Sequence, residues 1–260
     1  MAKRVDRRRA LATLAAGLGA LPLAGCDLFS QNPTVRNVLA SAEFLTIRAQ
    51  RLLLSRQALA QEFTEADISA HFRANGSTDP DDDAYQAFAQ SGFKDWRLQV
   101  DGLVEHPLQL SLDELRALPA RTQITRHDCV EGWSCIGKWT GVPLSIILQR
   151  ASLKPEARYI VFRCADSPDQ LANAPEEYKY YESIDLIDAF HPQTILAYDM
   201  NGAPLGIPYG APLRVRLERQ LDYKMAKYIM RIEALESFQH IAGGRGSYWA
   251  DRNYEWYAGI

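Results

Sequence analysis

The stretch His127-Asp128-Cys129-Val130-Glu131-Gly132-Trp133-Ser134-Cys135 is the one around which this 260-residue sequence is organised, and Lys138-Trp139-Thr140-Gly141-Val142-Pro143 closes it. It places a thiol beside acidic, aromatic and glycine positions. Such a segment is too polar for a core strand and too aromatic for a free linker. We therefore expect some of its side chains to face a pocket or a cofactor, and we interpret Cys129 as a metal-binding thiolate.

Length and composition define the broad class of protein. The chain is 47% hydrophobic and 10% aromatic, which is ample for a packed core in one large domain or two small ones. Its formal net charge of -3 gives no basic face. Nucleic-acid binding usually needs such a face, so no nucleic-acid partner is expected.

The first 26 residues have the pattern of an export signal. Arg7-Arg8-Arg9 precede an uncharged run from Ala10 to Gly25, which is as short as a signal core and rich in Ala and Gly. A permanent transmembrane helix is the weaker interpretation. The paired arginines before Ala10-Leu11 resemble a twin-arginine signal, which predicts export after folding.

The end of this signal predicts a lipid anchor. Leu23-Ala24-Gly25-Cys26 resembles a bacterial lipobox, in which Cys26 is acylated and becomes the first mature residue. Asp27 resembles the signal that retains some lipoproteins at the inner membrane. We therefore expect a lipid-anchored protein on the periplasmic face of that membrane, exported by the twin-arginine route.

The four cysteines leave two arrangements open. Cys26, Cys129, Cys135 and Cys164 could form two disulfides in an oxidising compartment. If Cys26 is lipidated, three remain, and at least one thiol is then free or bound to a metal. A disulfide between Cys129 and Cys135 is the structural alternative to a metal ligand.

Residues 27–90 are expected to form a helical arm and a loop. Thr34 can cap a helix that continues, with a break, to about Glu62, and Thr64 can cap a second helix over 65–71. The polar segment 77–83 reads as a solvated loop. We favour an arm that packs on the main domain over a helix on the membrane surface.

Residues 91–240 carry mixed helix and strand patterns, which predict an α+β (mixed α/β) domain. The aromatic segment 241–260 after it predicts a docked C-terminal arm. Ser111 opens a capping box, and Pro143 precedes a helix whose apolar stripe includes Leu144 and Ile147. Asn201-Gly202 predicts a hairpin turn. Strands are expected over 96–100, 122–125, 159–164, 194–200, 213–217 and 228–232.

Several cations follow a Gly/Pro-rich loop near the end of this domain. Strand alternation places Arg214 and Arg216 on one face, and Lys224 and Lys227 follow within a few residues. Such a cluster is commonly a solvated face. It can also hold a phosphate through arginine forks, a lysine charge and loop amides.

These pieces together resemble the molybdopterin-binding domain of the sulfite oxidase family, especially its bacterial protein-methionine-sulfoxide reductase branch. The resemblance runs from about Trp96 to Ile232. Residues 129–134 look like the branch's C-V-E-x-W-S signature, and Gly210-Ala211-Pro212-Leu213-Arg214 is similar to its N-G-A-P-x-R loop. Lys224-x-x-Lys227 is similar to its K-x-x-K.

The resemblance implies a sulfite-oxidase-type fold, here with an N-terminal helical arm, and a molybdopterin (Mo) cofactor. It implies that Cys129 is the catalytic thiolate on molybdenum. Further cofactor contacts carried over from the family are Arg214, Met225, Ala226 and Lys227. Cys164 and Tyr209 fall where the related reductase has a Thr and an Asn, and Arg73 and Asn75 lie near its N-terminal cofactor loop.

The resemblance also implies two-electron oxygen-atom transfer, with reduction of a sulfoxide or similar small oxo-substrate as the first choice. Sulfite-type oxidation with electrons passed to a cytochrome is the runner-up, and Arg126 and Arg163 are candidates for its anion pocket. The family's haem and dimerisation domains are not expected, so electrons would come from a membrane cytochrome b or quinol-linked partner. The alternative from another class is a non-catalytic lipoprotein that binds an anionic ligand or partner.

Overall fold

The computed structural model describes residues 33–53 and 55–260, which fall into two units, Met1–Leu53 and Leu54–Ile260. The expected signal and lipobox lie outside the described residues. The first unit contains the helix α2 (Pro33–Leu53). No helix in the described ranges combines the length and the apolar character that a membrane crossing requires.

Helix α2 differs from the expected arm at both ends. It begins at Pro33, a residue well suited to the first helical position, so Thr34 lies inside the helix and is not its cap. It runs without a break and ends at Leu53, and residues 55–63 are not helical. The predicted continuation to Glu62 is therefore wrong, because those residues pair with the second unit's own strands, as described below.

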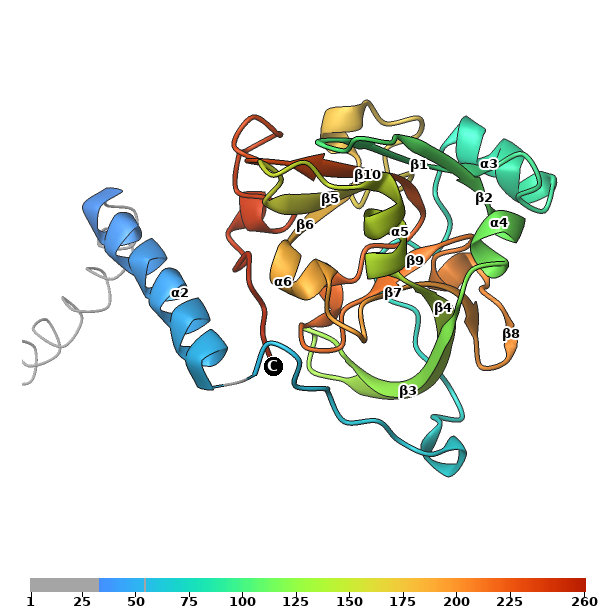
Figure 1. Cartoon of the computed structure of the whole chain (residues 1–260), viewed down its shortest axis with the longest axis horizontal. Helices are drawn as coiled ribbons and strands as arrows, with labels where there is room; N and C mark the ends of the chain where they lie inside the picture. The colour runs from blue at the N-terminus through green and yellow to red at the C-terminus, as the bar shows by residue number, and fades with distance from the viewer. Residues whose placement is uncertain (1–32, 54) are drawn as a thin grey trace, which may run out of the picture. The chain divides into compact units, whose positions relative to one another are not determined.

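The second unit is built on two five-stranded sheets (Figure 1). The first sheet has the order β2-β1-β10-β5-β6, in which β1 and β10 are parallel and the other pairs antiparallel. The second has the order β3-β4-β7-β8, with β9 also paired to β7. The strands are β1 (Arg97–Gly102), β2 (Leu108–Ser111), β3 (Arg121–Asp128), β4 (Ser134–Pro143), β5 (Tyr159–Cys164), β6 (Tyr181–Asp185), β7 (Ile195–Met200), β8 (Ala203–Pro204), β9 (Arg214–Arg216) and β10 (Ile229–Leu235).

Short helices connect these strands. The α-helices of the second unit are α3 (Asp83–Gln90), α4 (Leu112–Arg116), α5 (Leu144–Ala151) and α6 (Leu186–Ala189). Single turns of 3-10 helix are η1 (Glu65–Asp67), η2 (Glu176–Tyr178), η3 (Ile207–Tyr209), η4 (Asp222–Lys224) and η5 (Ala250–Arg252). The expected mixed α/β character is confirmed.

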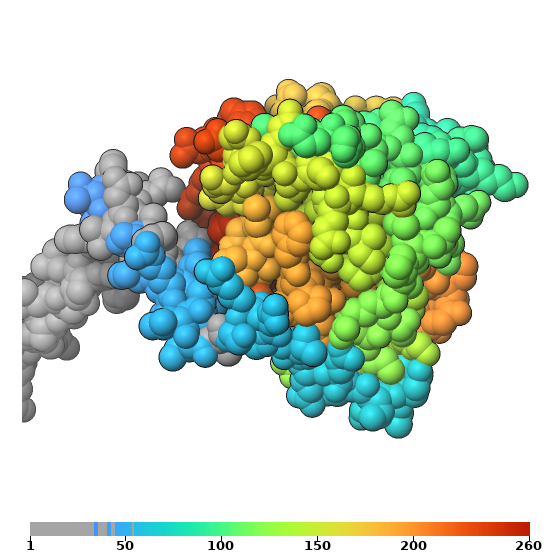
Figure 2. All heavy atoms as spheres, viewed as in Figure 1, coloured from blue at the N-terminus to red at the C-terminus, as the bar shows by residue number. Residues whose placement is uncertain are grey.

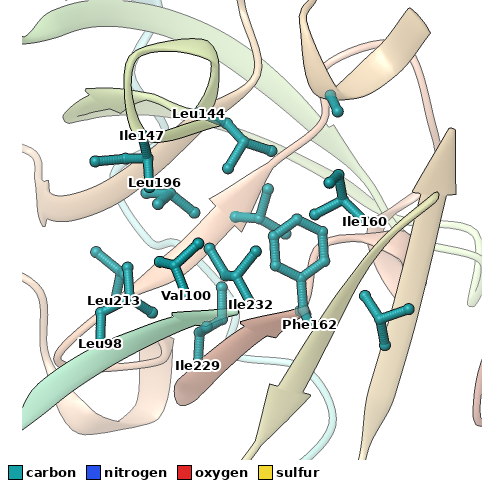
Figure 3. Close-up of a cluster of buried hydrophobic side chains, with 14 of the residues drawn as sticks. Leu98, Val100, Leu144, Ile147, Ile160, Phe162, Leu196, Leu213, Ile229 and Ile232 are labelled. Carbon is teal, nitrogen blue, oxygen red and sulfur yellow. The ribbon is translucent and has the colours of Figure 1, made fainter. Parts of the chain in front are cut away.

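The main hydrophobic core lies where the first sheet meets α5 and the second sheet (Figure 3). Leu98 and Ile232 from the first sheet point toward Ile147 of α5 and Leu196 of β7. Burying each such side chain stabilises the fold by roughly 1.5–3 kcal/mol. The apolar stripe predicted after Pro143 is the buried face of α5.

The local signals for helix starts had mixed outcomes. Ser111 forms the expected capping box, since its Oγ accepts from Glu114 N at 3.1 Å and Glu114 Oε2 accepts from Ser111 N at 2.8 Å. Thr64 N and Oγ1 both donate to Asp67 Oδ2, at 2.9 Å and 2.7 Å, but only η1 follows. The predicted helix over 65–71 is wrong, because Ser69 N donates to Ile136 O of β4 at 3.0 Å.

Most strand predictions match, and four strands were missed. Segment 159–164 coincides with β5, and 122–125 lies inside the longer β3. Asp101-Gly102, expected as a turn, still belongs to β1. A Cβ on Gly102 would lie 2.3 Å from Ala234 O, so only glycine permits this strand to lie so close to β10. The missed strands are β2, β4, β6 and β8, and β6 contains two polar residues that are fully buried, Glu182 and Ser183.

Two extended segments lie on the second unit. The N-terminal strap, residues 55–63, runs as blue spheres over the green β3–β4 region and the orange α6–β7 region (Figure 2). Phe63 N donates to Ile124 O at 2.8 Å, and Ala60 N donates to Gln193 Oε1 at 2.8 Å. The C-terminal arm, residues 241–260, is docked through Tyr248 N to Tyr181 O at 3.0 Å.

Candidate cofactor site

Cys129 lies at the tip of the hairpin formed by β3 and β4. The two strands pair as far as Asp128 and Ser134. Cys129 N donates to Trp133 O at 2.9 Å, and Gly132 N donates to Cys129 O at 2.9 Å. Gly132 has φ +87°, a conformation that favours glycine. The opening motif is therefore a tight hairpin loop, which was not predicted.

The hairpin tip faces a cavity of about 170 Å³. Cys129 is on its wall and is 7% exposed. Five parts of the chain meet there: the hairpin tip, the loop after Phe72, the connection between β5 and β6, the segment around η4, and the C-terminal arm. The lining residues are Asn75, Gly76, Ser77, Cys129, Val130, Glu131, Asp166, Pro168, Tyr180, Asp222, Tyr223, Met225, Lys227, Trp249 and Tyr254.

All three cysteines of the described chain are free thiols. The alternative of a Cys129–Cys135 disulfide is therefore wrong, since Cys135 instead donates to His71 O at 3.7 Å. Burial, together with its hydrogen bond to the Asp222 carboxylate, raises the pKa of Cys129 to about 12. Cys129 is thus protonated here, and binding a metal would displace the proton from Sγ.

Asp222 joins the parts of the chain around Cys129. This buried carboxylate accepts from Val130 N at 3.1 Å and from Asn75 Nδ2. His127 Nε2 lies 3.8 Å from it. Because Arg216 Nη1 can only donate, His127 Nδ1 accepts its hydrogen bond at 2.8 Å, so neutral His127 carries its proton on Nε2, toward Asp222.

Burial keeps His127 neutral. It lowers the pKa of the imidazole well below its ordinary value, and the nearby Arg216 guanidinium lowers it further. Arg216 is itself held by Glu218, whose Oε2 lies 2.7 Å from Nη2. The side chains behind the hairpin tip are therefore a buried polar network with fixed orientations.

Arg214 and Lys227 are buried cations whose bonds go to carbonyl oxygens. Arg214 Nη1 donates to Tyr209 O at 3.0 Å, and Lys227 Nζ donates to Asn75 O at 2.7 Å and to Ser77 O. Burial, with repulsion from Arg216, lowers the pKa of Arg214 to about 9, and burial, with repulsion from Arg214, lowers that of Lys227 to about 7. A bound anion would relieve both costs.

The neighbouring cations in the same segments are satisfied differently. Arg216 pairs with Glu218, and Lys224 pairs with Glu182, whereas no carboxylate of the described chain forms an ion pair with Arg214 or Lys227. Lys224 of the K-x-x-K pattern therefore has a structural partner. This difference singles out Arg214 and Lys227 as the pair that fits a phosphate.

One polar atom close to the cavity, Arg214 Nε, is buried without a hydrogen-bond partner in the described chain. The Ser77 hydroxyl interacts with the Asp166 carboxylate, and burial raises the pKa of Asp166 to about 6. Buried polar atoms normally have partners, so a ligand that accepts a hydrogen bond from Arg214 is expected. One thiol, two cations without a carboxylate partner and this donor fit a phosphate-bearing, metal-carrying heterocycle such as molybdopterin.

The structure brings only some of the predicted site residues to the cavity. Cys129, Asn75, Met225 and Lys227 line it. Arg214 and Ala226 are buried just behind the lining, beside Met225 and Lys227. For all of these, contact with the cofactor stays a prediction.

The other three predicted residues lie outside the lining. Tyr209 donates its hydroxyl to Phe72 O at 3.0 Å, and Cys164 belongs to the hydrophobic core. The Arg73 side chain is 64% exposed and lies over the Trp133 ring at 5.2 Å. Their contact with the cofactor is likewise untested.

Sequence reasoning missed several lining residues. Asp166 directly follows a recognised strand, at a position where polar groups often serve a site, so its place in the chain was a usable signal. Asp222 and Tyr223 lie just before the K-x-x-K pattern. For Trp249 and Tyr254 the aromatic composition of the arm was visible, but nothing local indicated that the arm reaches the cavity.

The fold and the site define a cofactor-binding domain with a single protein thiolate for a metal. The chain belongs to the oxidoreductase molybdopterin-binding domain family, whose model matches residues 85–240. It is thus a molybdopterin-dependent oxidoreductase, as the sequence resemblance implied.

Two relatives by sequence support this assignment. The chain is 36% identical to a putative protein-methionine-sulfoxide reductase subunit YedZ1 of Azospira oryzae, over 97% of this chain and 87% of that protein. It is 33% identical to the protein-methionine-sulfoxide reductase catalytic subunit MsrP of Xanthomonas campestris, over 91% and 72%. The sulfane dehydrogenase SoxCD from Paracoccus pantotrophus superposes with a TM-score of 0.49 at 22% identity, over 70% of this chain and 46% of that chain.

Proposed function

We propose that this oxidoreductase reduces sulfoxides by oxygen-atom transfer. When bound, the cofactor supplies a molybdenum centre that exchanges an oxygen atom together with two electrons. Cys129 holds that centre, while Arg214 and Lys227 hold the cofactor's phosphate end. The relatives named as methionine-sulfoxide reductase subunits support this reaction.

The observation that carries the proposal is the charge of the cavity. Glu131, Asp166 and Asp222 line it, and Lys227 is the one cation among the lining residues. Because Lys227 is assigned to the cofactor's phosphate, the described lining offers no further cation for a second anion. An anion such as sulfite would be repelled there, whereas a neutral sulfoxide would not.

The runner-up, sulfite-type oxidation, lacks its anion pocket. Arg126 lies outside the lining and pairs with Asp128 at 2.8 Å. Arg163 pairs with Glu233 at 3.1 Å and is likewise outside the lining. The non-catalytic alternative is wrong, since the family is one of oxidoreductases and the disulfide it required is not formed.

Assays of the molybdenum-loaded enzyme test the proposal. We expect the reduced enzyme to be reoxidised by methyl sulfoxides, and the oxidised enzyme not to be reduced by sulfite. The opposite preference would refute it.

Cys129→Ser should reduce turnover by more than about 100-fold, beyond the usual cost of changing an outer-shell partner, and alter the metal's absorption spectrum. Cys135→Ser is the matched control, because that thiol is free and outside the cavity lining. It should retain activity and spectrum. Full turnover in Cys129→Ser would contradict the role of Cys129.

We further propose that the protein is exported by the twin-arginine route and anchored through Cys26 at the periplasmic face of the inner membrane. The signal pattern and lipobox support this location. A lipid anchor would keep the enzyme beside a membrane cytochrome b or quinol-linked protein, from which it would take electrons.

A further inference from the structure

One wall of the cavity is a loop without regular structure, residues 72–77, which we call the Asn75 loop. Asn75, Gly76 and Ser77 line the cavity. The loop belongs to no helix or strand, and within the described chain no backbone–backbone hydrogen bond reaches it. Its backbone polar groups must therefore be satisfied by side chains, and its position depends on those side chains.

A tyrosine hydroxyl holds each end of the Asn75 loop. The Tyr209 hydroxyl donates to Phe72 O at 3.0 Å, and the Tyr228 hydroxyl donates to Ser77 O at 2.8 Å. The Lys227 ammonium bonds to the middle of the loop, as described above. The carbonyl oxygens at the start, middle and end of the loop are thus all bound by side chains of one later segment, 209–228.

The Phe72 end of the loop is fixed by its ring as well as by its carbonyl. The Phe72 ring is buried, 6.0 Å from the Tyr209 ring at 86° and 5.4 Å from both His127 and Trp139. A Cβ on Gly137 would lie 3.0 Å from the Phe72 ring, so β4 packs closely against it. Phe72 therefore anchors the loop on the second sheet.

The tyrosine at the other end has an unusual backbone conformation. Tyr228 has φ +53°, which a bulky side chain rarely adopts, and its side chain is buried. Its ring packs edge-on against Tyr85 at 5.4 Å. Burial raises the pKa of the Tyr228 hydroxyl, which therefore remains a hydrogen-bond donor. Such a conformation persists where the surrounding structure enforces it, and it is common at binding sites.

The same two tyrosines are connected to the two cations assigned to the cofactor's phosphate. Tyr209 O accepts a hydrogen bond from Arg214 Nη1 at 3.0 Å. Tyr228 directly follows Lys227, whose Nζ lies 5.1 Å from the centre of the Tyr228 ring. Each tyrosine thus connects one end of the Asn75 loop to one of these cations.

We propose that Tyr209 and Tyr228 are positioning residues, which hold the Asn75 loop in its cofactor-binding position and so determine how long molybdopterin is retained. The inference rests on the cofactor placement proposed above and not on the reaction with sulfoxides. A loop that is ordered before binding loses less conformational entropy when the cofactor binds. Tyr209 would then support cofactor binding through the loop, without touching the cofactor itself.

Molybdenum retention by the full-length, molybdenum-loaded protein tests this inference. Tyr209→Phe and Tyr228→Phe each remove one hydroxyl and keep the ring. We expect the rate of molybdenum loss during dialysis to rise about fivefold in each variant, which corresponds to one neutral hydrogen bond. The double variant should lose the metal about 25-fold faster, because the two bonds hold opposite ends of the loop and should act independently.

Hydrogen–deuterium exchange of the loaded protein supplies a second measurement. Amides of residues 72–77 should exchange faster in both single variants than in wild type, because the loop opens more often. Exchange in the first sheet should be unchanged. Neither measurement needs turnover, so failure of the proposed sulfoxide reaction would leave both results unaffected.

Tyr198→Phe is the matched control, because Tyr198 is a buried tyrosine of β7 outside the cavity lining. It should retain molybdenum as wild type does. Replacing Tyr209 by 4-aminophenylalanine, whose amino group can donate to Phe72 O, should restore most of the retention. A general loss of stability would not be reversed in this way.

Three results would overturn the inference. The first is wild-type molybdenum retention in both single variants and in the double variant. The second is faster metal loss without faster exchange in residues 72–77, because the tyrosines would then act on the cofactor by another route. The third is equally fast loss in Tyr198→Phe, because any buried tyrosine hydroxyl would then have the same effect.

Discussion

At the scale of single residues, Asp222 shows how one buried carboxylate can organise a site. Three separate segments meet at its two oxygens: the Cys129 hairpin tip, the loop that carries Asn75, and its own turn, η4. Its charge is tolerated because each oxygen accepts a hydrogen bond from a part-buried donor. Removing it would leave those donors unpaired.

Asp222→Ala should therefore lower the free energy of unfolding by about 2–4 kcal/mol, which corresponds to two unsatisfied part-buried donors. Urea denaturation monitored by tryptophan fluorescence measures this change. Glu131→Gln, a substitution in the same cavity wall at a side chain that is 58% exposed, is the control and should change stability by less than about 0.5 kcal/mol. Equal stability of both variants would contradict the role of Asp222.

At the scale of elements, the N-terminal strap depends on His191, which lies between α6 and β7. Gln193 N donates to His191 Nδ1 at 3.2 Å, so neutral His191 carries its proton on Nε2, which donates to Ala58 O of the strap at 3.0 Å. Burial lowers the pKa of His191 to about 4, and Arg219 lowers it further. Protonating Nδ1 would break the bond from Gln193.

The free energy of unfolding should depend on pH, because His191 binds a proton more weakly in the folded chain than in the unfolded chain. The unfolded chain binds a proton at His191 near pH 6.5, whereas the folded chain does so only near pH 4, so stability falls as the pH drops through this window. Between pH 6.5 and 4, the free energy of unfolding of His191→Gln should fall by about 2 kcal/mol less than that of wild type. This value allows for partial solvent screening of His191. Urea denaturation at several pH values measures the difference.

The pH profile of wild type must be compared with that of His191→Gln, because two other buried groups, Asp166 and Glu182, have shifted pKa values in or near the same pH range. Burial raises the pKa of Asp166 to about 6 and that of Glu182 to about 7, which favours the folded state at low pH in both proteins. Their effects cancel in the difference between wild type and His191→Gln. Parallel pH profiles of the two proteins would rule out the His191 contribution.

At the scale of the whole molecule, the catalytic unit and the expected anchor belong to different parts of the chain. The second unit, Leu54–Ile260, contains both sheets and the whole cavity. Membrane attachment would come from Cys26 alone, outside that unit. A mutation that removes membrane attachment should therefore leave the catalytic activity intact.

Cys26→Ser should move the protein from the membrane fraction to the soluble periplasmic fraction, because the lipid chains contribute about 0.8 kcal/mol of membrane affinity per buried CH₂. Fractionation of cells followed by immunoblotting measures this. The released enzyme should retain sulfoxide turnover with a soluble viologen donor and lose it with the membrane donor. Wild-type protein found in the soluble fraction would disprove the anchor.

The sequence by itself determined the features that depend on neighbours along the chain. The capping box at Ser111, the apolar stripe of α5 and the strand β5 follow from local hydrogen bonding and from periodicity. The order of the cysteine motif and the Arg/Lys segment was enough to indicate the family and its cofactor.

Only the tertiary structure decided which side chains meet at the cavity. Asp222 and the aromatic pair Trp249 and Tyr254 come from segments about 90 and 120 residues after Cys129, and no local pattern reports such a contact. The same holds for the free state of Cys135, which spacing alone left open. Packing between distant elements sets these contacts, because the burial that stabilises them exists only in the folded chain.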